Sequence, residues 1–305
     1  RALILLECLV ILALAGLNAG GHSYAIDNEV QFQTTRSLVQ LKPQLESLDT
    51  IWLESDVGPY REHPNGGYVG IVGIGHSIVA APLYATSRLA AQLLPVDDRD
   101  NFIRTGTFFT NSVVLALIAV TIVLLGLELT SSFRAAYAIS LAYTFGTYAF
   151  PHAKTFFTEP TSALVVTLGV LAAARWRRTQ GPWLVILCGF LAGFGVMVRV
   201  SAAMFVPIFA VWLVVIGFRR GGLRAATRVL LLFTAGGLLP LIAFLLLNWW
   251  RFGSPVDLGY PSVPQSFPLL EGLLNQFFRP GKSLFLFAPI IVLGIAGMFA
   301  GIRRD

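Results

Sequence analysis

The sequence is poor in charge, and this shortage argues against a soluble protein. Of its 305 residues only 12% are Asp, Glu, Lys or Arg, and 55% are hydrophobic. A soluble domain carries about 25% charged residues. With a mean hydropathy of +0.72, the chain could not cover a water-exposed surface with polar groups. The composition therefore predicts a membrane protein.

Cysteine is scarce as well, which excludes a disulfide framework and a cysteine-based metal site. Cys8 and Cys188 are the only two, and both lie inside apolar stretches. The sequence also lacks a glycine loop that could cradle a phosphate and any basic stretch interleaved with aromatic residues. Its net charge of +6 comes from basic residues gathered in short loops, a pattern typical of membrane topology. We expect no nucleic-acid partner.

The apolar residues come in blocks, and a membrane-spanning helix needs about 20 mostly apolar residues. Clear blocks lie near 2–20, 106–127, 134–150, 160–174, 183–198, 200–218, 228–247 and 283–301, and a weaker, glycine-rich block covers 68–94. We therefore predict an all-α fold. It is a polytopic transmembrane helical bundle of about eight or nine membrane helices, with juxtamembrane helices in the first outer loop. The first block is read as a retained helix and not a signal peptide.

The orientation follows from the cationic loops, because cytoplasmic loops are enriched in Lys and Arg. The strongest are Arg175, Arg177 and Arg178; Arg219, Arg220, Arg224 and Arg228; and Arg303 and Arg304. Between the first two lies an apolar stretch interrupted at Arg199, long enough for two short helices. The count then puts segments 21–67, 95–105, 151–159 and 248–282 outside. Block 68–94 must enter and leave on one face or lie along the membrane surface. We treat residues 1–305 as a single membrane domain, and expect it to be a fragment because it starts at Arg1.

Three acidic side chains fall on the outer side and are the candidate catalytic residues. Asp27 and Glu29 follow the first helix, and Glu159 precedes Pro160 at the start of another. A carboxylate beside the lipid interface can accept a proton from a hydroxyl or hold a divalent metal. The alternatives are a solvated loop carboxylate for Asp27 and Glu29. For Glu159 the alternative is a favourable charge at the positive end of a helix.

Basic side chains from separate places in the sequence fall on the same side. The candidate substrate-binding residues are His63, Lys154, Arg199, Arg251 and Lys282. Ionisable groups at membrane boundaries are costly unless they are paired, hydrated or functional. Arg199 could bind a lipid phosphate with its fixed donor fork or extend to the headgroups. His63 could be a turn histidine before proline, and Lys282 could anchor to headgroups.

The order of these features resembles the glycosyltransferase C superfamily, in particular prokaryotic relatives of protein mannosyltransferases and of the aminoarabinose lipid A transferase. The matching stretches are YAIDNE after the first helix, GIGHSIVAAPLYATSRL, AKTFFTEP, NWWRFGSPVDLGY and FFRPGKSLFLFAPIIVL. They follow the family order over most of the chain. The stretch YVGIVG at 68–73 departs from the pattern, since relatives often carry a Lys or another polar residue there.

The resemblance implies an inverting transferase in a prokaryotic plasma membrane, with its active site on the outer face. It would move a sugar from a polyprenyl-phosphate carrier to a hydroxyl of a glycan, lipid or protein acceptor. Asp27 would be the base, Glu29 and Glu159 would support it or hold a divalent cation, and Arg199 and Lys154 would contact the donor phosphate. Two other classes stay open, a transporter or flippase of a lipid-linked precursor and a non-enzymatic membrane scaffold.

Overall fold

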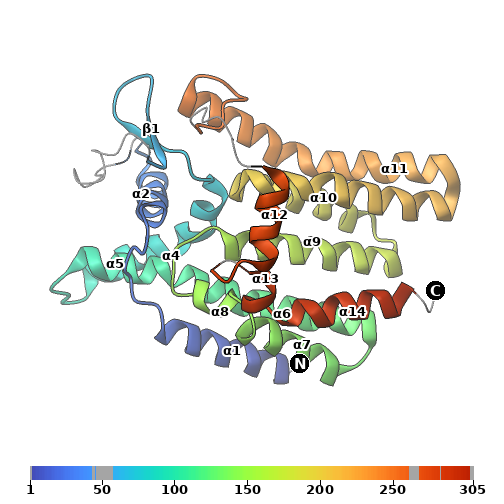
Figure 1. Cartoon of the computed structure of the whole chain (residues 1–305). Coiled ribbons are helices and arrows are strands. Elements are labelled where there is room, and N and C mark those ends of the chain that lie inside the picture. The colour runs from blue at the N-terminus through green and yellow to red at the C-terminus, as the bar shows by residue number, and fades with distance from the viewer. Residues whose placement is uncertain (1, 43–44, 46–57, 261–267, 282, 303–305) are drawn as a thin grey trace.

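The computed structural model describes residues 2–42, 45, 58–260, 268–281 and 283–302, and the chain in these ranges is mostly helical (Figure 1). The all-α class is therefore confirmed. The N-terminal elements are α1 (Ala2–Leu17), α2 (Ile26–Gln40), β1 (Tyr60–Glu62), β2 (Tyr68–Gly70), α4 (Ile74–Leu93) and α5 (Arg99–Phe108). They are followed by α6 (Thr110–Thr130), α7 (Phe133–Phe145), α8 (Ala149–His152), α9 (Glu159–Thr179) and α10 (Pro182–Val198). The last are η1 (Val200–Met204), α11 (Phe205–Phe252), α12 (Leu269–Phe278), α13 (Leu284–Phe287) and α14 (Ile290–Ile302).

Helices α6, α9, α10 and α11 run side by side, and α1 and α7 pack against α6 (Figure 1). At one end of this bundle, α2, α4, α5 and the β1–β2 hairpin form a smaller group. The hairpin is antiparallel and pairs Tyr60 with Gly70 and Glu62 with Tyr68. The sequence did not predict these strands, because each is only three residues long.

Helix α11 is two helices joined at a sharp break. Gly221 and Gly222 have non-helical backbone angles, and φ of Gly222 is +63°. Beyond the break the chain reverses, so that Gly217 faces Ala226 and Val229. The separate blocks predicted at 200–218 and 228–247 are thus present. The turn predicted at Arg199 is present too, between α10 and η1.

Block 68–94 was predicted to enter and leave on one face or to lie along the surface. The first alternative is wrong, because α4 is one continuous helix of 20 residues and cannot return to its starting face. Segment 21–67 holds the predicted helix as α2, and the predicted outer loop 95–105 holds most of α5.

Within the described residues, two helical segments are long and apolar enough to cross a membrane, Arg99–Thr130 and Val200–Phe252. Ala2–Leu17, Pro182–Val198 and Ile290–Phe299 are shorter apolar helices. The larger number of crossings expected from the sequence stays a prediction.

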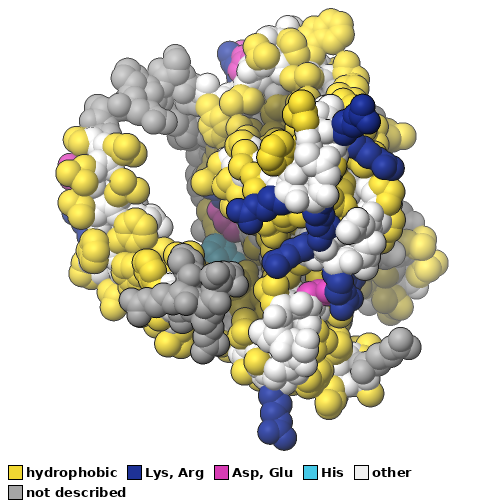
Figure 2. Space-filling model, turned by 90° about the vertical axis from the view of Figure 1, so that its right-hand side faces the viewer, with side chains coloured by type: hydrophobic (Ala, Val, Ile, Leu, Met, Phe, Trp, Pro, Cys, Tyr) yellow, Lys and Arg dark blue, Asp and Glu magenta, His cyan; other side chains and the backbone are white. Residues whose placement is uncertain are grey.

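Basic side chains gather at the end of the bundle opposite α2, surrounded by hydrophobic ones (Figure 2). Arg175 and Arg178 on α9 lie 3.3 and 3.2 Å from the Glu128 carboxylate on α6. Arg220, beside the break in α11, donates a hydrogen bond to the carbonyl of Arg177. Two of the cationic loops that the sequence assigns to one side of the membrane, those at 175–178 and 219–228, therefore lie together.

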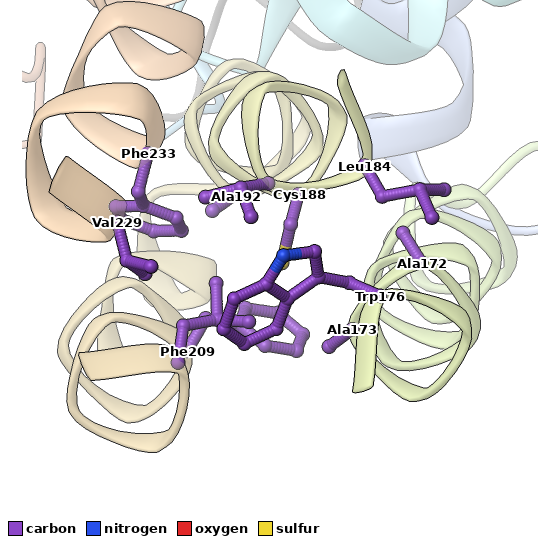
Figure 3. Close-up of a cluster of buried hydrophobic side chains, with 11 residues drawn as sticks. Ala172, Ala173, Trp176, Leu184, Cys188, Ala192, Phe209, Val229 and Phe233 are labelled. Carbon is purple, nitrogen blue, oxygen red and sulfur yellow. The ribbon is translucent and has the colours of Figure 1, made fainter. Parts of the chain in front are cut away.

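The largest apolar core joins α9, α10 and the two halves of α11 (Figure 3). Trp176 of α9 lies between Cys188 of α10 and Phe209 and Phe233 of α11, and all four are buried. Cys188 and Cys8 are free thiols. This core fixes the far ends of the helices that carry Glu159 and Arg199 at their near ends.

Candidate functional site

A cavity of about 240 Å³ lies where α2, α9 and α10 meet. Asp27 in the first turn of α2, Glu159 at the start of α9 and Arg199 just after α10 all line it. The structure thus brings together three residues that are far apart in the sequence. Gln31, Gly73 and Tyr260 also line the cavity.

Local sequence explains why each charged residue lies at an element's end. Pro160 directly follows Glu159, and proline is favoured in the first helical turn because its missing N–H is not needed there. Helix α10 ends at Val198, and Arg199 has an extended backbone with φ −157° and ψ 127°. Asp27 lies in the first turn of α2, where the helix dipole favours a carboxylate.

The two carboxylates of the cavity differ in their electrostatic surroundings. Glu159 forms an ion pair with Arg199 through Oε1. Its Oε2 is buried and has no hydrogen-bond partner among the described residues. The pKa of Asp27 is raised above its ordinary value of 3.8, first by burial and second by the charge of Glu159, although Arg199 opposes the shift. A raised pKa makes Asp27 a stronger base than an ordinary aspartate.

Buried hydrogen bonds tie α2 and α9 to α4. The Gln31 side chain, one turn after Asp27, donates to Ser77 Oγ at 2.6 Å and to the Gly73 carbonyl at 3.3 Å. His76 is fully buried, and its Nδ1 lies 2.8 Å from Thr161 Oγ1 in the first turn of α9. Sequence reasoning missed Gln31 and His76. The four-residue spacing from Asp27 to Gln31 was a signal, because residues so spaced share a helix face.

Glu29 lies elsewhere. Positions two apart on a helix do not face each other, and Glu29 lines a different pocket, of about 340 Å³, together with Arg104. Its carboxylate accepts hydrogen bonds from Ser23 at 2.8 Å, Gln33 at 2.9 Å and Arg104 Nη2 at 3.2 Å. Burial alone would raise the pKa of Glu29, but these hydrogen bonds and the Arg104 charge hold it below the ordinary 4.5. Arg104 is a third residue that sequence reasoning missed.

The predicted metal site is therefore not formed by Asp27, Glu29 and Glu159. Within the described ranges, no group of three or more His, Cys, Asp or Glu side chains is placed to hold a metal ion. Glu29 points into another pocket, and Glu159 is held by Arg199. These residues do not fit a divalent cation, and we derive no chemical step through one.

Two other predicted residues lie outside the Asp27 cavity. The Lys154 ammonium lies 5.2 Å from the centre of the Tyr24 ring. The His63 Nδ1 accepts a hydrogen bond from the Asn65 amide at 3.1 Å. Its Nε2 therefore carries the proton that it donates to the Trp250 carbonyl, 3.0 Å away. Nδ1 of His63 thus closes the turn of the β-hairpin and Nε2 links the hairpin to α11, which agrees with the turn alternative.

Arg251 is buried at the C-terminal end of α11, where it lines a second cavity of about 490 Å³. Most of this cavity's wall is apolar, with Leu38, Leu41 and Leu247 among its residues. The Arg251 guanidinium donates to the carbonyl of Val72 at 3.1 Å, and Val72 lines the Asp27 cavity. No described carboxylate lies within ion-pair distance of it. Lys282 lies outside the described residues.

Comparison with family models, with curated proteins and with solved structures finds no match for this chain.

Proposed function

We propose that this protein is an integral membrane glycosyltransferase of the polytopic kind that the apolar blocks predict. The two membrane-length helices support membrane insertion. Exposed apolar side chains such as Leu231, Leu239 and Leu293, each more than 60% exposed, support it further, because soluble monomers rarely leave large contiguous apolar surfaces uncovered. The basic end of the bundle would be cytoplasmic. The Asp27 cavity, at the other end, would open on the outer face of a prokaryotic plasma membrane.

The observation that carries the proposal is the shared cavity of Asp27, Glu159 and Arg199. Within one cavity it combines a carboxylate of raised pKa with an ion pair between Glu159 and Arg199. A general base needs such a carboxylate, and a departing phosphate needs a cation nearby. A membrane scaffold needs neither group in a cavity.

The reaction would be a single displacement. The acceptor oxygen attacks the anomeric carbon of a polyprenyl-phosphate sugar while Asp27 takes the hydroxyl proton. The bond from the anomeric carbon to the phosphate oxygen breaks, and the phosphate leaves with the electron pair. Attack opposite the leaving group inverts the anomeric centre. Because the phosphate is already an anion, no strong general acid is required.

The cavity beside Arg251 fits the donor's other parts. Its apolar wall would hold the prenyl chain, and burial of such a chain contributes about 25 cal/mol per Å². Arg251 would bind the phosphate, since a buried cation with no acidic partner favours an anionic ligand. The stretch 69–74 contributes to both cavities, since Val69, Gly70 and Ile74 line this one and Ile71, Val72 and Gly73 line the Asp27 cavity. The phosphate could therefore lie near Arg251 or Arg199 while the sugar reaches Asp27.

The test is the variant Asp27→Asn in membranes supplied with a radiolabelled polyprenyl-phosphate sugar. The amide keeps the size of the side chain but cannot take the proton, so we expect transfer to fall by about 10²–10⁴-fold. Asp97→Asn is the matched control, because Asp97 is an exposed aspartate in the loop before α5 and should leave the rate unchanged. Wild-type transfer by Asp27→Asn would refute the proposal. Movement of the label across the membrane without transfer would identify a flippase.

A further inference from the structure

We propose that the acceptor is a lipid, whose hydrocarbon chain lies in a third cavity between α6, α7, α9, α13 and α14 and whose hydroxyl-bearing head reaches the Asp27 cavity. This inference rests on the proposed function and specifies its acceptor.

The third cavity has a volume of about 360 Å³ and both polar and apolar lining residues. Tyr148, His152 and Glu159 line it within the segment that leads into α9. Further along, Ala163 lies one turn into α9, and Ile118 of α6 and Ile291 of α14 complete an apolar wall. Polar groups at one end and hydrocarbon at the other match an amphiphile with a small polar head.

Glu159 connects this cavity to the Asp27 cavity, because it lines both. Its Oε1 pairs with Arg199, whereas the buried Oε2 has no partner among the described residues. A buried carboxylate oxygen without a hydrogen bond destabilises the protein. A hydroxyl donated by a bound head group would satisfy it, and would hold that head next to Asp27.

Charge distinguishes the two apolar cavities. The second cavity, proposed to hold the donor, is lined by the basic residues Arg251 and Lys42, which suit a phosphate. The third cavity is lined by no Lys or Arg among the described residues, and its one charged lining residue is Glu159. A carboxylate repels a phosphate and accepts a hydroxyl. The third cavity therefore fits an uncharged, hydroxyl-bearing lipid head better than the donor's phosphate.

The apolar wall also decides between acceptor classes. A soluble glycan or a polar peptide loop would bury its hydrogen-bonding groups against Ile118, Ala163 and Ile291 without partners, at a cost. An alkyl chain would instead gain from leaving water or headgroups. This favours a lipid over a soluble glycan.

The experiment uses the full chain in nanodiscs and a dodecyl glucoside that carries a diazirine on its chain. After illumination, mass spectrometry maps the labelled residues. We expect labelling on α13 and α14, in the stretch from Leu284 to Ile291. Ala163→Trp fills the cavity, so labelling there should fall about tenfold, as for a loss of about 1.4 kcal/mol of binding.

The matched control is Ala243→Trp, the same change at a half-buried alanine of α11 that lines none of these cavities. It should keep the wild-type labelling, and thermal unfolding checks that both variants are folded. Ala163→Leu, a smaller change, should give an intermediate loss if Ala163→Trp unfolds. The inference is overturned if neither Ala163 substitution changes the labelling, or if the label attaches outside the stretch from Leu284 to Ile291.

A second arm separates this inference from the proposed function. Asp27 does not line the third cavity, so Asp27→Asn should bind the probe as the wild type does while it loses transfer. In the transfer assay, dodecyl glucoside should compete with the natural acceptor at least about tenfold more strongly than ethyl glucoside. Equal competition would refute a lipid acceptor and leave the role of Asp27 standing.

Discussion

The group of elements around the Asp27 cavity and the hairpin of α10 with α11 are held together in different ways. Around the cavity, buried polar side chains join neighbouring elements, as Gln31 joins Ser77 and His76 joins Thr161. Between α10 and α11, backbones meet directly. A Cβ at Gly236 would overlap the carbonyl oxygen of Ile186, and one at Gly189 would overlap that of Phe233.

The difference matches what each region has to do. Small residues let membrane helices approach closely, and the gain is a broad van der Waals contact. Such a contact makes a firm support but does not select one side-chain geometry. Hydrogen bonds are directional, so the polar contacts can fix where Asp27 and Glu159 point. We infer that the α10–α11 hairpin supplies rigidity and that the α2–α4–α9 contacts supply alignment.

The largest expected effect tests the close approach of α10 and α11. Gly236→Ala places a methyl group against backbone that cannot move aside, so we expect a loss of about 3 kcal/mol in unfolding free energy. The measurement is thermal or denaturant unfolding in detergent micelles. Gly237→Ala is the matched control, because a Cβ at Gly237 would lie 3.4 Å from its nearest neighbour, the Gly189 carbonyl oxygen. Equal losses in the two variants would contradict the close-approach interpretation.

The next effect tests the polar side of the comparison through Glu29. The folded protein holds the pKa of Glu29 below 4.5 by hydrogen bonds that outweigh burial. Its contribution to stability is therefore present above that value and is lost as the pH falls through the lower, folded-state pKa. Glu29→Gln should cost about 2 kcal/mol at neutral pH, since it weakens charged hydrogen bonds to Arg104.

The stability difference between the wild type and Glu29→Gln should shrink on acidification below about pH 4.5. Glu62→Gln, which changes an exposed carboxylate on β1, should show no such convergence. A difference that stays constant down to strongly acidic pH would mean that the Glu29 charge adds nothing to stability.

A smaller effect is expected at the contact between His76 and Thr161. Thr161→Val keeps the side-chain shape but leaves Nδ1 of a fully buried imidazole without its partner, at a cost of about 1 kcal/mol. If this contact aligns α9, the rate of transfer should fall while the apparent affinity for the donor changes little. Thr179→Val, at an exposed position of the same helix, is the control. A stability loss without any change in rate would make the contact purely structural.

Sequence reasoning predicted the helices of the main bundle because the apolar blocks there are separated by clear breaks. The turn at Arg199 and the return at Gly221 follow from charge and glycine inside apolar sequence. The short strands β1 and β2 were missed because three residues carry too little periodicity. For block 68–94 a return was one of two alternatives, and the continuous helix α4 excludes it. Both lie in the end group, where polar composition hides the elements.

The site was predicted in part. Boundaries between apolar blocks indicated Asp27, Glu159 and Arg199, and the structure brings them into one cavity. Glu29 was grouped with Asp27 by proximity in sequence, although a helix points the two residues in different directions. Gln31 and His76 were missed because they are ordinary polar residues until the packing of α2, α4 and α9 is known. Side-chain pairing across elements is what the sequence could not supply.

The smallest expected effect tests how the cavity's own charges tune Asp27. If Asp27 is the base, transfer falls on acidification as its carboxylate becomes protonated. Because its pKa is raised by burial and then by Glu159, the fall should begin above the ordinary value of 3.8. Glu159→Gln removes a negative charge and should move the midpoint to lower pH. Arg199→Gln removes a positive charge and should move it to higher pH.

Each shift should be about one pH unit or less, since both side chains are partly exposed and water screens their charges. The measurement is the rate of transfer against pH at low and high salt, and high salt should reduce both shifts. Shifts of the two variants in the same direction would show that Asp27 does not sense this ion pair. Opposite shifts in the two variants, together with an unchanged midpoint in the Glu62→Gln control, would instead tie the acidic limb of the profile to the Asp27 cavity. Such a result would distinguish this polar end from the glycine contact between α10 and α11, where Gly237→Ala should leave the midpoint unchanged.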